Sequence, residues 1–231
     1  MKIHRFYISP EKAEIEAKFK VDDSELYNQF RNVLRFTAGT EVVLFDGSGF
    51  EYKAQVVEMS RGSVHFKVSG RKKGWVPEKN ISLYQAMVKK DKCEWIAEKA
   101  TEIGVEKIYF FVSERSEKKG LDMRRVEKKI IEAAEQSGRV TIPKVRFVEN
   151  FEKALSESRN PILFHTIGVL LKEREELKMK IADLFVGPEG GWTEKEVETT
   201  LKQGIPVVTL GEQILRAETA AIATLSVLMF S

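Results

Sequence analysis

Strand-like and helix-like patterns alternate along the last two thirds of the chain. Short apolar runs predict strands at 81–87, 108–112, 162–164, 181–186 and 206–210. Segments with apolar residues at helical spacing predict helices between and after these strands, at 92–103, 122–137, 151–156, 193–203 and 214–229. Because parallel strands need crossover connections, this alternation is typical of a mostly parallel sheet covered by helices. We therefore expect an α/β domain in this part of the chain.

The first third of the chain has a different pattern. Apart from one helical segment at 24–36, it predicts short strands at 3–8, 41–45, 50–58 and 63–68. Short strands separated by glycine turns are typical of a small barrel or sheet. The polar stretch 70–80 contains a glycine and a proline, as stretches between domains often do. We therefore predict one domain at 1–73 and a second at 74–231.

Basic residues are in excess only in the first third. The formal net charge of the whole chain is +3, which by itself does not indicate a nucleic-acid binder. Residues 1–73 hold 13 Lys and Arg against 10 Asp and Glu, whereas the remainder holds 25 against 25. The excess includes the triplet Arg71-Lys72-Lys73. Such a triplet is either a solvated linker or an RNA contact.

The composition disfavours several classes of protein. The chain starts without an apolar run of signal-peptide length, and its longest apolar stretch, 217–230, is too short to span a bilayer. Cys93 is the only cysteine, which excludes an intrachain disulfide. The three histidines, His4, His65 and His165, lack the spacing of metal ligands. We expect a cytoplasmic protein with no membrane segment and no metal site.

Two loops that contain glycine follow predicted strands in the second domain. Residues 187–191, Gly-Pro-Glu-Gly-Gly, come after the strand at 181–186, and residues 210–220 follow the strand at 206–210. In open α/β sheets, ligands bind beyond the carboxyl ends of strands, and glycine lets a ligand approach the backbone. The first loop lacks both the Lys-Ser or Lys-Thr of a P-loop and the spacing of the dinucleotide fingerprint.

Loops of this kind also occur as plain turns. The presence of two such loops on neighbouring strands favours a binding site. The charges of Arg216 and Glu218, set beside an otherwise apolar helix, favour it further. Thr193 and Glu196 form a capping-box pattern, so we expect a helix to begin at Thr193.

The two loops together resemble the cofactor region of the knotted SPOUT methyltransferases. More narrowly, the chain resembles the bacterial RsmE family, which methylates N3 of a uridine in 16S ribosomal RNA. Besides the two loops, the matching residues are His4-Arg5-Phe6-Tyr7, Val33-Leu34-Arg35, Gln85-Ala86, Lys90-Asp91-Lys92, Lys99-Ala100-Thr101-Glu102-Ile103-Gly104-Val105, Ser113-Glu114-Arg115-Ser116 and Glu135-Gln136-Ser137-Gly138-Arg139. The resemblance covers both predicted domains. One departure is Gln213, where many relatives have arginine.

The resemblance implies a fold, a cofactor and a substrate. The second domain would be a SPOUT-type α/β domain with a deep trefoil knot, and the first a small PUA-like β-barrel that binds RNA. The cofactor would be S-adenosyl-L-methionine. The substrate would be 16S rRNA of the small ribosomal subunit, methylated at uracil 1498 in the family's usual rRNA numbering. Such domains act as homodimers, with the active site at the subunit interface.

The family match also assigns roles to residues of the two loops. Arg216 is expected to be an active-site cation, unless it forms a buried ion pair with Glu218 or Glu189. Glu189 would be a base or would hold Arg216 in place. Arg115, outside the two loops, follows the strand at 108–112 and so lies at the same edge of the sheet, where we expect it to clamp a phosphate or a base. Contacts with the cofactor are expected of Gly187, Pro188, Gly190, Leu210, Gly211, Ile214, Leu215, Thr219 and Ala220.

RNA contacts are expected of basic and polar residues in both domains. The expected residues are Arg5, Arg31, Arg35, Arg71, Lys72, Gln136 and Arg139. For Gln136 and Arg139, which lie where a predicted helix ends, capping and solvation are the alternative roles. RNA affinity should fall with salt, by roughly 0.7–0.9 log units per log unit of salt for each phosphate contact.

Two other functions are weighed against the methyltransferase. A ribosome-assembly protein would bind RNA and use the knotted domain only to dimerise, but such a protein need not keep intact glycine loops. A dinucleotide-dependent oxidoreductase would need the glycine fingerprint followed by an acidic residue about 20 positions on, which the chain lacks. Binding of S-adenosyl-L-methionine separates the enzyme from the assembly protein, and failure to bind NAD(H) would exclude the oxidoreductase.

Overall fold

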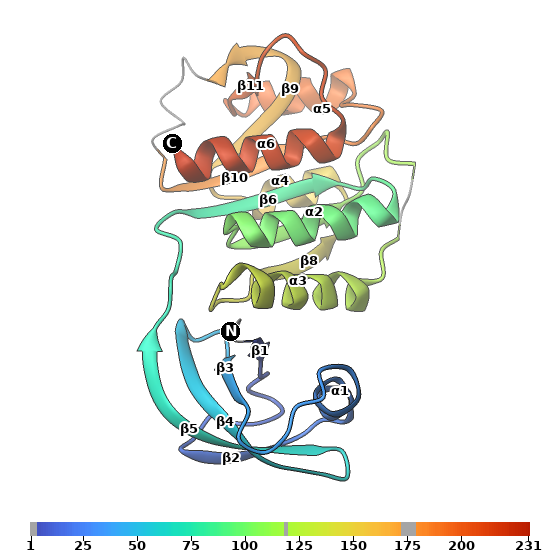
Figure 1. Cartoon of the computed structure of the whole chain (residues 1–231). Helices are drawn as coiled ribbons and strands as arrows, with labels where there is room; N and C mark the ends of the chain where they lie inside the picture. The colour runs from blue at the N-terminus through green and yellow to red at the C-terminus, as the bar shows by residue number, and fades with distance from the viewer. Residues whose placement is uncertain (1–3, 118–119, 172–178) are drawn as a thin grey trace. The chain divides into compact units, whose positions relative to one another are not determined.

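The computed structural model describes residues 4–117, 120–171 and 179–231 (Figure 1). The chain divides into two compact units. Unit 1 comprises Met1–Val76 and Ala134–Ile142, and unit 2 comprises Pro77–Ala133 and Pro143–Ser231. The stretch 134–142 thus groups with the first unit, although a division at residue 73 assigns it to the second.

Unit 1 contains a five-stranded sheet with the order β1-β3-β4-β5-β2. β1 pairs with β3 in parallel, and the other neighbours pair antiparallel. The strands are β1 (Arg5–Tyr7), β2 (Lys18–Asp22), β3 (Glu41–Phe45), β4 (Phe50–Ser60) and β5 (Ser63–Lys73). The predicted β structure of the first third is confirmed. The basic triplet at 71–73 lies at the end of β5, not in a linker.

The helical segment of unit 1 packs into the hydrophobic core of that unit. α1 (Ser24–Asn28) begins after Asp23, whose carboxylate accepts hydrogen bonds from the first turn, and it continues as a π-helical stretch, Gln29–Val33. Phe30 on that stretch is fully buried, and its ring lies 4.5 Å from the ring of Phe6. The helix predicted at 24–36 therefore ends earlier, at Val33.

Unit 2 contains a six-stranded sheet in which all neighbouring strands are parallel, as the alternating pattern predicted. The order is β11-β9-β10-β6-β7-β8. The strands are β6 (Asn80–Ala86), β7 (Lys107–Phe111), β8 (Lys144–Val148), β9 (Pro161–Leu170), β10 (Ile181–Val186) and β11 (Val207–Thr209).

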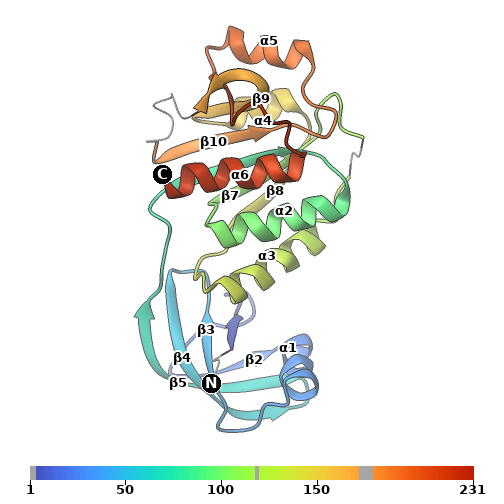
Figure 2. The same cartoon turned by 45° about the horizontal axis from the view of Figure 1, so that its top comes forward.

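Helices cover this sheet, and α2 and α6 lie side by side on one face (Figures 1 and 2). No helix among the described residues is long and apolar enough to cross a membrane. The helices after β6 are α2 (Lys90–Ile103), α3 (Met123–Ser137), α4 (Phe151–Glu157), α5 (Glu194–Lys202) and α6 (Ala217–Phe230).

Local signals decide where two of these helices begin and end. Gly104 ends α2 with a φ of 109°, which side-chain-bearing residues rarely adopt. Thr193 and Glu196 form both bonds of the predicted capping box at the start of α5. The prediction that the last helix starts at 214 was wrong, because α6 starts at Ala217 after an extended Arg216.

The strand order determines where the two glycine loops lie. β10 is hydrogen-bonded to both β9 and β6, and β11 is hydrogen-bonded to β9. The prediction that the two loops follow neighbouring strands was therefore wrong, because β9 lies between β10 and β11. Because these strands are parallel, the loops after β10 and β11 emerge at the same edge of the sheet. A trefoil knot is defined by the continuous path of the chain, which includes residues 172–178 outside the described ranges. The knot therefore stays a prediction.

Candidate functional site

A cavity of about 350 Å³ lies between the two glycine loops at the carboxyl edge of the sheet. One wall, here called the first wall, is the loop 187–192 after β10. The opposite wall, the second wall, is the loop 210–216 between β11 and α6. The residues that line the cavity are Phe164, His165, Thr166, Val186, Gly187, Pro188, Glu189, Gly191, Trp192, Thr209, Leu210, Gln213, Ile214, Leu215, Arg216, Ala217, Ala220 and Thr224.

Most of the residues predicted to bind the cofactor line this cavity. Six of the nine do so, together with the two charged candidates Glu189 and Arg216. Gly190, Gly211 and Thr219 do not line it, and neither does Arg115. The predicted residues on the lining are Gly187, Pro188, Leu210, Ile214, Leu215 and Ala220.

Trp192, which carried no sequence prediction, forms part of the first wall. Its side chain is buried, and its indole Nε1 donates a hydrogen bond of 2.8 Å to the carbonyl of Phe164. The indole also stacks on Phe111, with an interplanar angle of 10°. A Cβ at Gly187 would lie 3.2 Å from the indole ring, so Gly187 lets the backbone lie close against Trp192. The apolar and fixed ring gives the cavity a flat surface.

Arg115, which lies in the loop after β7, braces the first wall. Its guanidinium donates hydrogen bonds to the carbonyls of Gly190 at 3.2 Å and Trp192 at 3.1 Å. A Cβ at Gly190 would lie 3.1 Å from the Cβ of Arg115, so the glycine allows this close approach. Arg115 therefore has the place of a support, and its contact with a phosphate or base stays a prediction.

Gln85 supports the same wall from inside the sheet. Its fully buried side chain donates from Nε2 to the carbonyls of Ala86 at 2.8 Å, Gly187 at 3.2 Å and Val186 at 3.5 Å. Of the two ends of the amide, only the NH₂ group can donate to carbonyls, and this fixes the orientation of the amide. Its Oε1 is buried and has no hydrogen-bond partner among the described residues. The sequence feature that indicates this supporting role is a polar residue within the apolar run that forms β6.

The second wall has few hydrogen bonds of its own. The Thr209 hydroxyl donates to the carbonyl of Gly211 at 2.9 Å and accepts from its N–H at 3.2 Å. The N–H groups of residues 212–216 donate to no other described residue. Ile214 is 84% exposed, an unusual position for a large apolar side chain in a loop. The second wall therefore offers free backbone donors beside an unpacked apolar group.

Lys92, in the first turn of α2, bridges the two carboxylates nearest the cavity. Its Nζ lies 3.0 Å from Glu218 and 3.5 Å from Glu189. The alternative in which Arg216 pairs with either glutamate is not realised, since neither carboxylate pairs with it among the described ion pairs. Arg216 is exposed at the cavity, and its guanidinium is available to a ligand.

Two titratable groups near the cavity have shifted pKa values. Burial raises the pKa of Glu218, but the hydrogen bond with its own backbone and the Lys92 ammonium outweigh burial and hold that pKa below its usual value. Burial lowers the pKa of His165, which lines the cavity. Its Nδ1 accepts a hydrogen bond of 2.8 Å from the N–H of Ile167. At neutral pH His165 is therefore an uncharged lining residue with its proton on Nε2.

Similarity to known families covers both units of the chain. The RNA methyltransferase domain family matches residues 76–229, and the RNA methyltransferase PUA domain family matches residues 22–69. The ribosomal RNA small subunit methyltransferase E of Bacillus subtilis (strain 168) is 31% identical, over 99% of this chain and 96% of its own. The chain belongs to this methyltransferase E family. The family predicted from the sequence and the PUA-like nature of the first domain are thereby confirmed.

Two solved structures of methyltransferases share the whole fold. A methyltransferase from Legionella pneumophila, in complex with the bound cofactor SAM, has a TM-score of 0.89 and 26% identity, covering 99% of this chain and 97% of its own. The methyltransferase E of Neisseria gonorrhoeae, bound to S-adenosyl methionine, has a TM-score of 0.86 and 28% identity, covering 97% of this chain and 96% of its own.

The predicted RNA contacts of unit 1 fall into exposed and structural groups. Arg5 is structural, because its guanidinium pairs with Glu51 at 2.5 Å and donates to the carbonyl of Gly138 at 3.0 Å. Lys72, more exposed, pairs with the same Glu51 at 2.7 Å. The guanidinium of Arg71 stacks 3.7 Å from the ring centroid of Phe50. Arg71 and Lys72 thus remain at the surface.

The other four predicted contacts differ in exposure. Arg31 is exposed and donates to the hydroxyl of Tyr27. Arg35 is exposed on a backbone with a φ of 54°. Gln136 is exposed too. Arg139 is only 4% exposed, donates to the hydroxyl of Thr141, and has a pKa lowered to about 10 by burial. Its geometry is that of a structural residue.

No group of three or more His, Cys, Asp or Glu side chains arranged to hold a metal ion occurs in the part of the chain that the structure describes. Cys93, which lies in the first turns of α2, is fully buried, and burial raises the pKa of its thiol to about 11. It is therefore a core residue and a poor nucleophile.

Proposed function

We propose that the chain transfers a methyl group from S-adenosyl-L-methionine to N3 of one uridine in 16S rRNA of the small ribosomal subunit, at position 1498 in the family's usual numbering. The observation that carries this proposal is the cavity between two glycine loops at one edge of a parallel sheet. It occurs in a chain of the methyltransferase E family whose structural relatives hold S-adenosyl methionine.

The cavity has the size and chemistry for this cofactor. Its volume of about 350 Å³ is in the range of small-molecule sites. An adenine ring needs flat apolar surfaces, which Trp192, Ile214 and Leu215 offer. The ring nitrogens and the carboxylate of the cofactor need hydrogen-bond donors, which the N–H groups of the second wall supply. The residues present therefore fit the cofactor through backbone and packing, in the way that the family match implies.

The chemistry is an in-line displacement at the methyl carbon, and the cofactor supplies that methyl group as a sulfonium. The protein must orient N3 toward the methyl group and favour loss of the N3 proton. Arg216 lies exposed on the cavity lining without an ion pair to another described residue. A guanidinium so placed stabilises the anion that develops on the uracil ring. Glu189, tied to Lys92, has a positioning role in this scheme.

Unit 1 would bind the RNA. Arg35, Arg71 and Lys72 are exposed basic side chains of the PUA-like unit, and Arg71 is held flat by its stacking on Phe50. Phosphate contacts by such residues predict that RNA affinity falls steeply as salt rises. A ribosomal substrate also implies a cytoplasmic protein.

A homodimer would cover the outer face of α6. This helix packs against α2, β6 and β10, yet it still exposes Phe230 at 72% and Val227 at 41%. An apolar helix face of this kind is typical of a subunit interface. The proposal also includes a trefoil knot in unit 2 and an active site at the subunit interface, as the family resemblance implies.

The test is a transfer assay with labelled S-adenosyl-L-methionine and small ribosomal subunits that lack the modification, followed by mass mapping of the 16S rRNA. The proposal predicts one methyl group at N3 of a single uridine. Tight cofactor binding without transfer to subunits or naked RNA would move the substrate elsewhere. Failure to bind the cofactor would favour a non-catalytic assembly protein.

A further inference from the structure

We infer that Lys92 is a positioning residue that joins the two walls of the cavity and holds them at the spacing the methyl donor needs. This inference rests on the proposed function, because it assumes that S-adenosyl-L-methionine is the ligand between the walls. It assigns to Lys92 a role in cofactor affinity and none in the transfer step.

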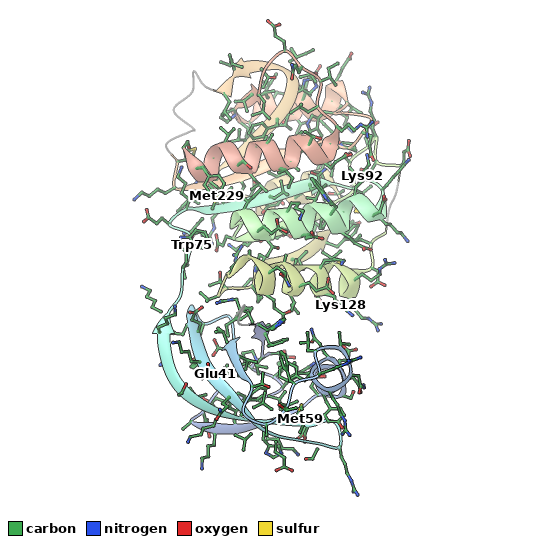
Figure 3. The ribbon with its side chains drawn as sticks, in the orientation of Figure 1. Glu41, Met59, Trp75, Lys92, Lys128 and Met229 are labelled. Atoms are coloured by element: carbon green, nitrogen blue, oxygen red, sulfur yellow. The ribbon has the colours of Figure 1, made fainter. Side chains whose placement is uncertain are left out.

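Lys92 contacts both walls through one ammonium group. Glu189 belongs to the first wall, and Glu218 lies in the first turn of α6, directly after the second wall. The Nζ of Lys92 is 3.5 Å from the first carboxylate and 3.0 Å from the second. Figure 3 labels Lys92 on α2, at the end of this helix that lies beside the start of α6.

The second wall depends on such a link because it lacks internal bonds. No N–H group from 212 to 216 donates to another described residue, so this loop is held mainly at its two ends. One end is β11, which pairs with β9. The other end is the start of α6, where Glu218 is tied to Lys92. α6 also packs against the sheet, and the ion pair adds a direct link from this end of the second wall to the first wall.

Removing the ammonium would also leave two carboxylates facing each other. Glu189 and Glu218 both lie within ion-pair distance of the same Nζ, so they are close to one another. Their side chains are 31% and 16% exposed, which means that water screens their repulsion only in part. Without Lys92, this repulsion would push the walls apart.

Lys92 itself does not line the cavity. It therefore cannot take a proton from the uracil ring or touch the cofactor in this arrangement, and it acts through the two glutamates. This distinguishes a positioning lysine, which changes affinity for the cofactor, from a catalytic lysine, which changes turnover at saturating cofactor.

The experiment measures the dissociation constant for S-adenosyl-L-methionine by calorimetry, together with KM and kcat, for the full chain and three variants. Lys92→Met should raise the dissociation constant and the KM for the cofactor about tenfold or more, with kcat nearly unchanged. Lys92→Arg should restore most of the affinity, since a guanidinium can bridge two carboxylates.

Lys99→Met is the matched control on the same helix. Lys99 also pairs with two glutamates, Glu98 at 2.7 Å and Glu102 at 2.8 Å, but it has no contact with either wall. Its variant should bind the cofactor like the unmodified chain. Thermal unfolding of all variants, together with the arginine rescue, separates a local effect from a folding defect.

The outcomes separate the inference from the proposed function. If the unmodified chain does not bind the cofactor, the proposed function fails and the inference fails with it. If that chain binds and the Lys92→Met variant binds equally well, only the inference is overturned. Normal cofactor affinity with a large loss of kcat would also overturn it, because Lys92 would then act in the transfer step.

Discussion

The two walls of the cavity come from loops of similar length, yet they are held very differently. In the first wall, carbonyl groups accept hydrogen bonds from the side chains of Arg115 and Gln85. The buried ring of Trp192, which belongs to this wall, is fixed by packing and by its own hydrogen bond to Phe164. The second wall leaves the N–H groups of 212–216 without partners among the described residues and exposes Ile214 at 84%.

The difference indicates that the two walls have different roles in ligand binding. A braced wall keeps its shape before the ligand arrives, so little ordering entropy is lost there on binding. A wall with free donors and an exposed apolar side chain gains its hydrogen bonds and packing from the ligand or from a partner, and such segments belong to the less stable parts of a fold. The first wall is thus pre-organised, whereas the second wall is completed on binding.

The largest effect is expected for Trp192→Ala. The substitution removes a buried ring that stacks on Phe111 and packs at a tilt against Phe151, and we expect the free energy of unfolding to fall by about 3–5 kcal/mol. Urea unfolding measures this change. Trp75→Ala is the matched control, because Trp75 is 57% exposed, and its effect should stay within about 0.5 kcal/mol. Equal effects of the two substitutions would contradict a braced first wall.

Arg115→Met should have the next largest effect, on cofactor binding. The methionine keeps the aliphatic part of the side chain but removes two hydrogen bonds to the carbonyls of Gly190 and Trp192. Hydrogen bonds to charged groups contribute about 1.5–3 kcal/mol, so the dissociation constant should rise roughly tenfold to a hundredfold. Calorimetry tests this, with the exposed Arg124→Met as control. Normal cofactor affinity with weakened RNA binding would instead support the phosphate clamp.

Ile214→Ala should distinguish most clearly between a wall that is packed before binding and a wall that is completed on binding. Because Ile214 is 84% exposed, the free energy of unfolding should change by less than about 0.5 kcal/mol. Cofactor affinity should fall by about 1–2 kcal/mol, since the ligand loses an apolar partner that becomes buried only on binding. A clear loss of stability without ligand would show that the second wall is packed before the cofactor binds.

The smallest effect is expected from pH. The pKa of Glu218 is lowered in the folded protein, so its stabilising contribution is complete above its ordinary value of 4.5 and is lost as the pH falls further. The contribution should be about 1 kcal/mol or less, because the pair is partly solvated. Thermal unfolding between pH 6 and pH 3, roughly the span of this titration, should show a shallower acid loss for Glu218→Gln than for the unmodified chain. Identical profiles would mean that the ion pair with Lys92 does not stabilise the fold.

Local patterns were sufficient to predict most of the second domain. The apolar runs predicted five of its strands, and the capping box predicted the start of α5. The strand β8 was missed because its sequence, Lys-Val-Arg-Phe-Val, lies at the edge of the sheet and is mostly exposed or half-buried. An edge strand carries a weaker apolar signal than a central one.

The supports of the site could not be predicted from local patterns. Arg115 reaches Trp192 across 77 positions, and Lys92 reaches Glu218 across 126 positions. Such contacts depend on strand order, which periodicity does not encode. The burial of Arg139 was missed for the same reason, since its position after a helix gave no sign of the packing around it.

Hydrogen exchange of the two walls, with and without S-adenosyl-L-methionine, tests the central claim most directly. The account predicts that backbone amides of 212–216 exchange fast in the free protein and become protected when the cofactor binds. The amide of Gly191 in the first wall, whose N–H donates to the carbonyl of Pro188 at 3.0 Å, should be protected in both states. Unchanged exchange at 212–216 under saturating cofactor would contradict the claim that the cofactor completes the second wall.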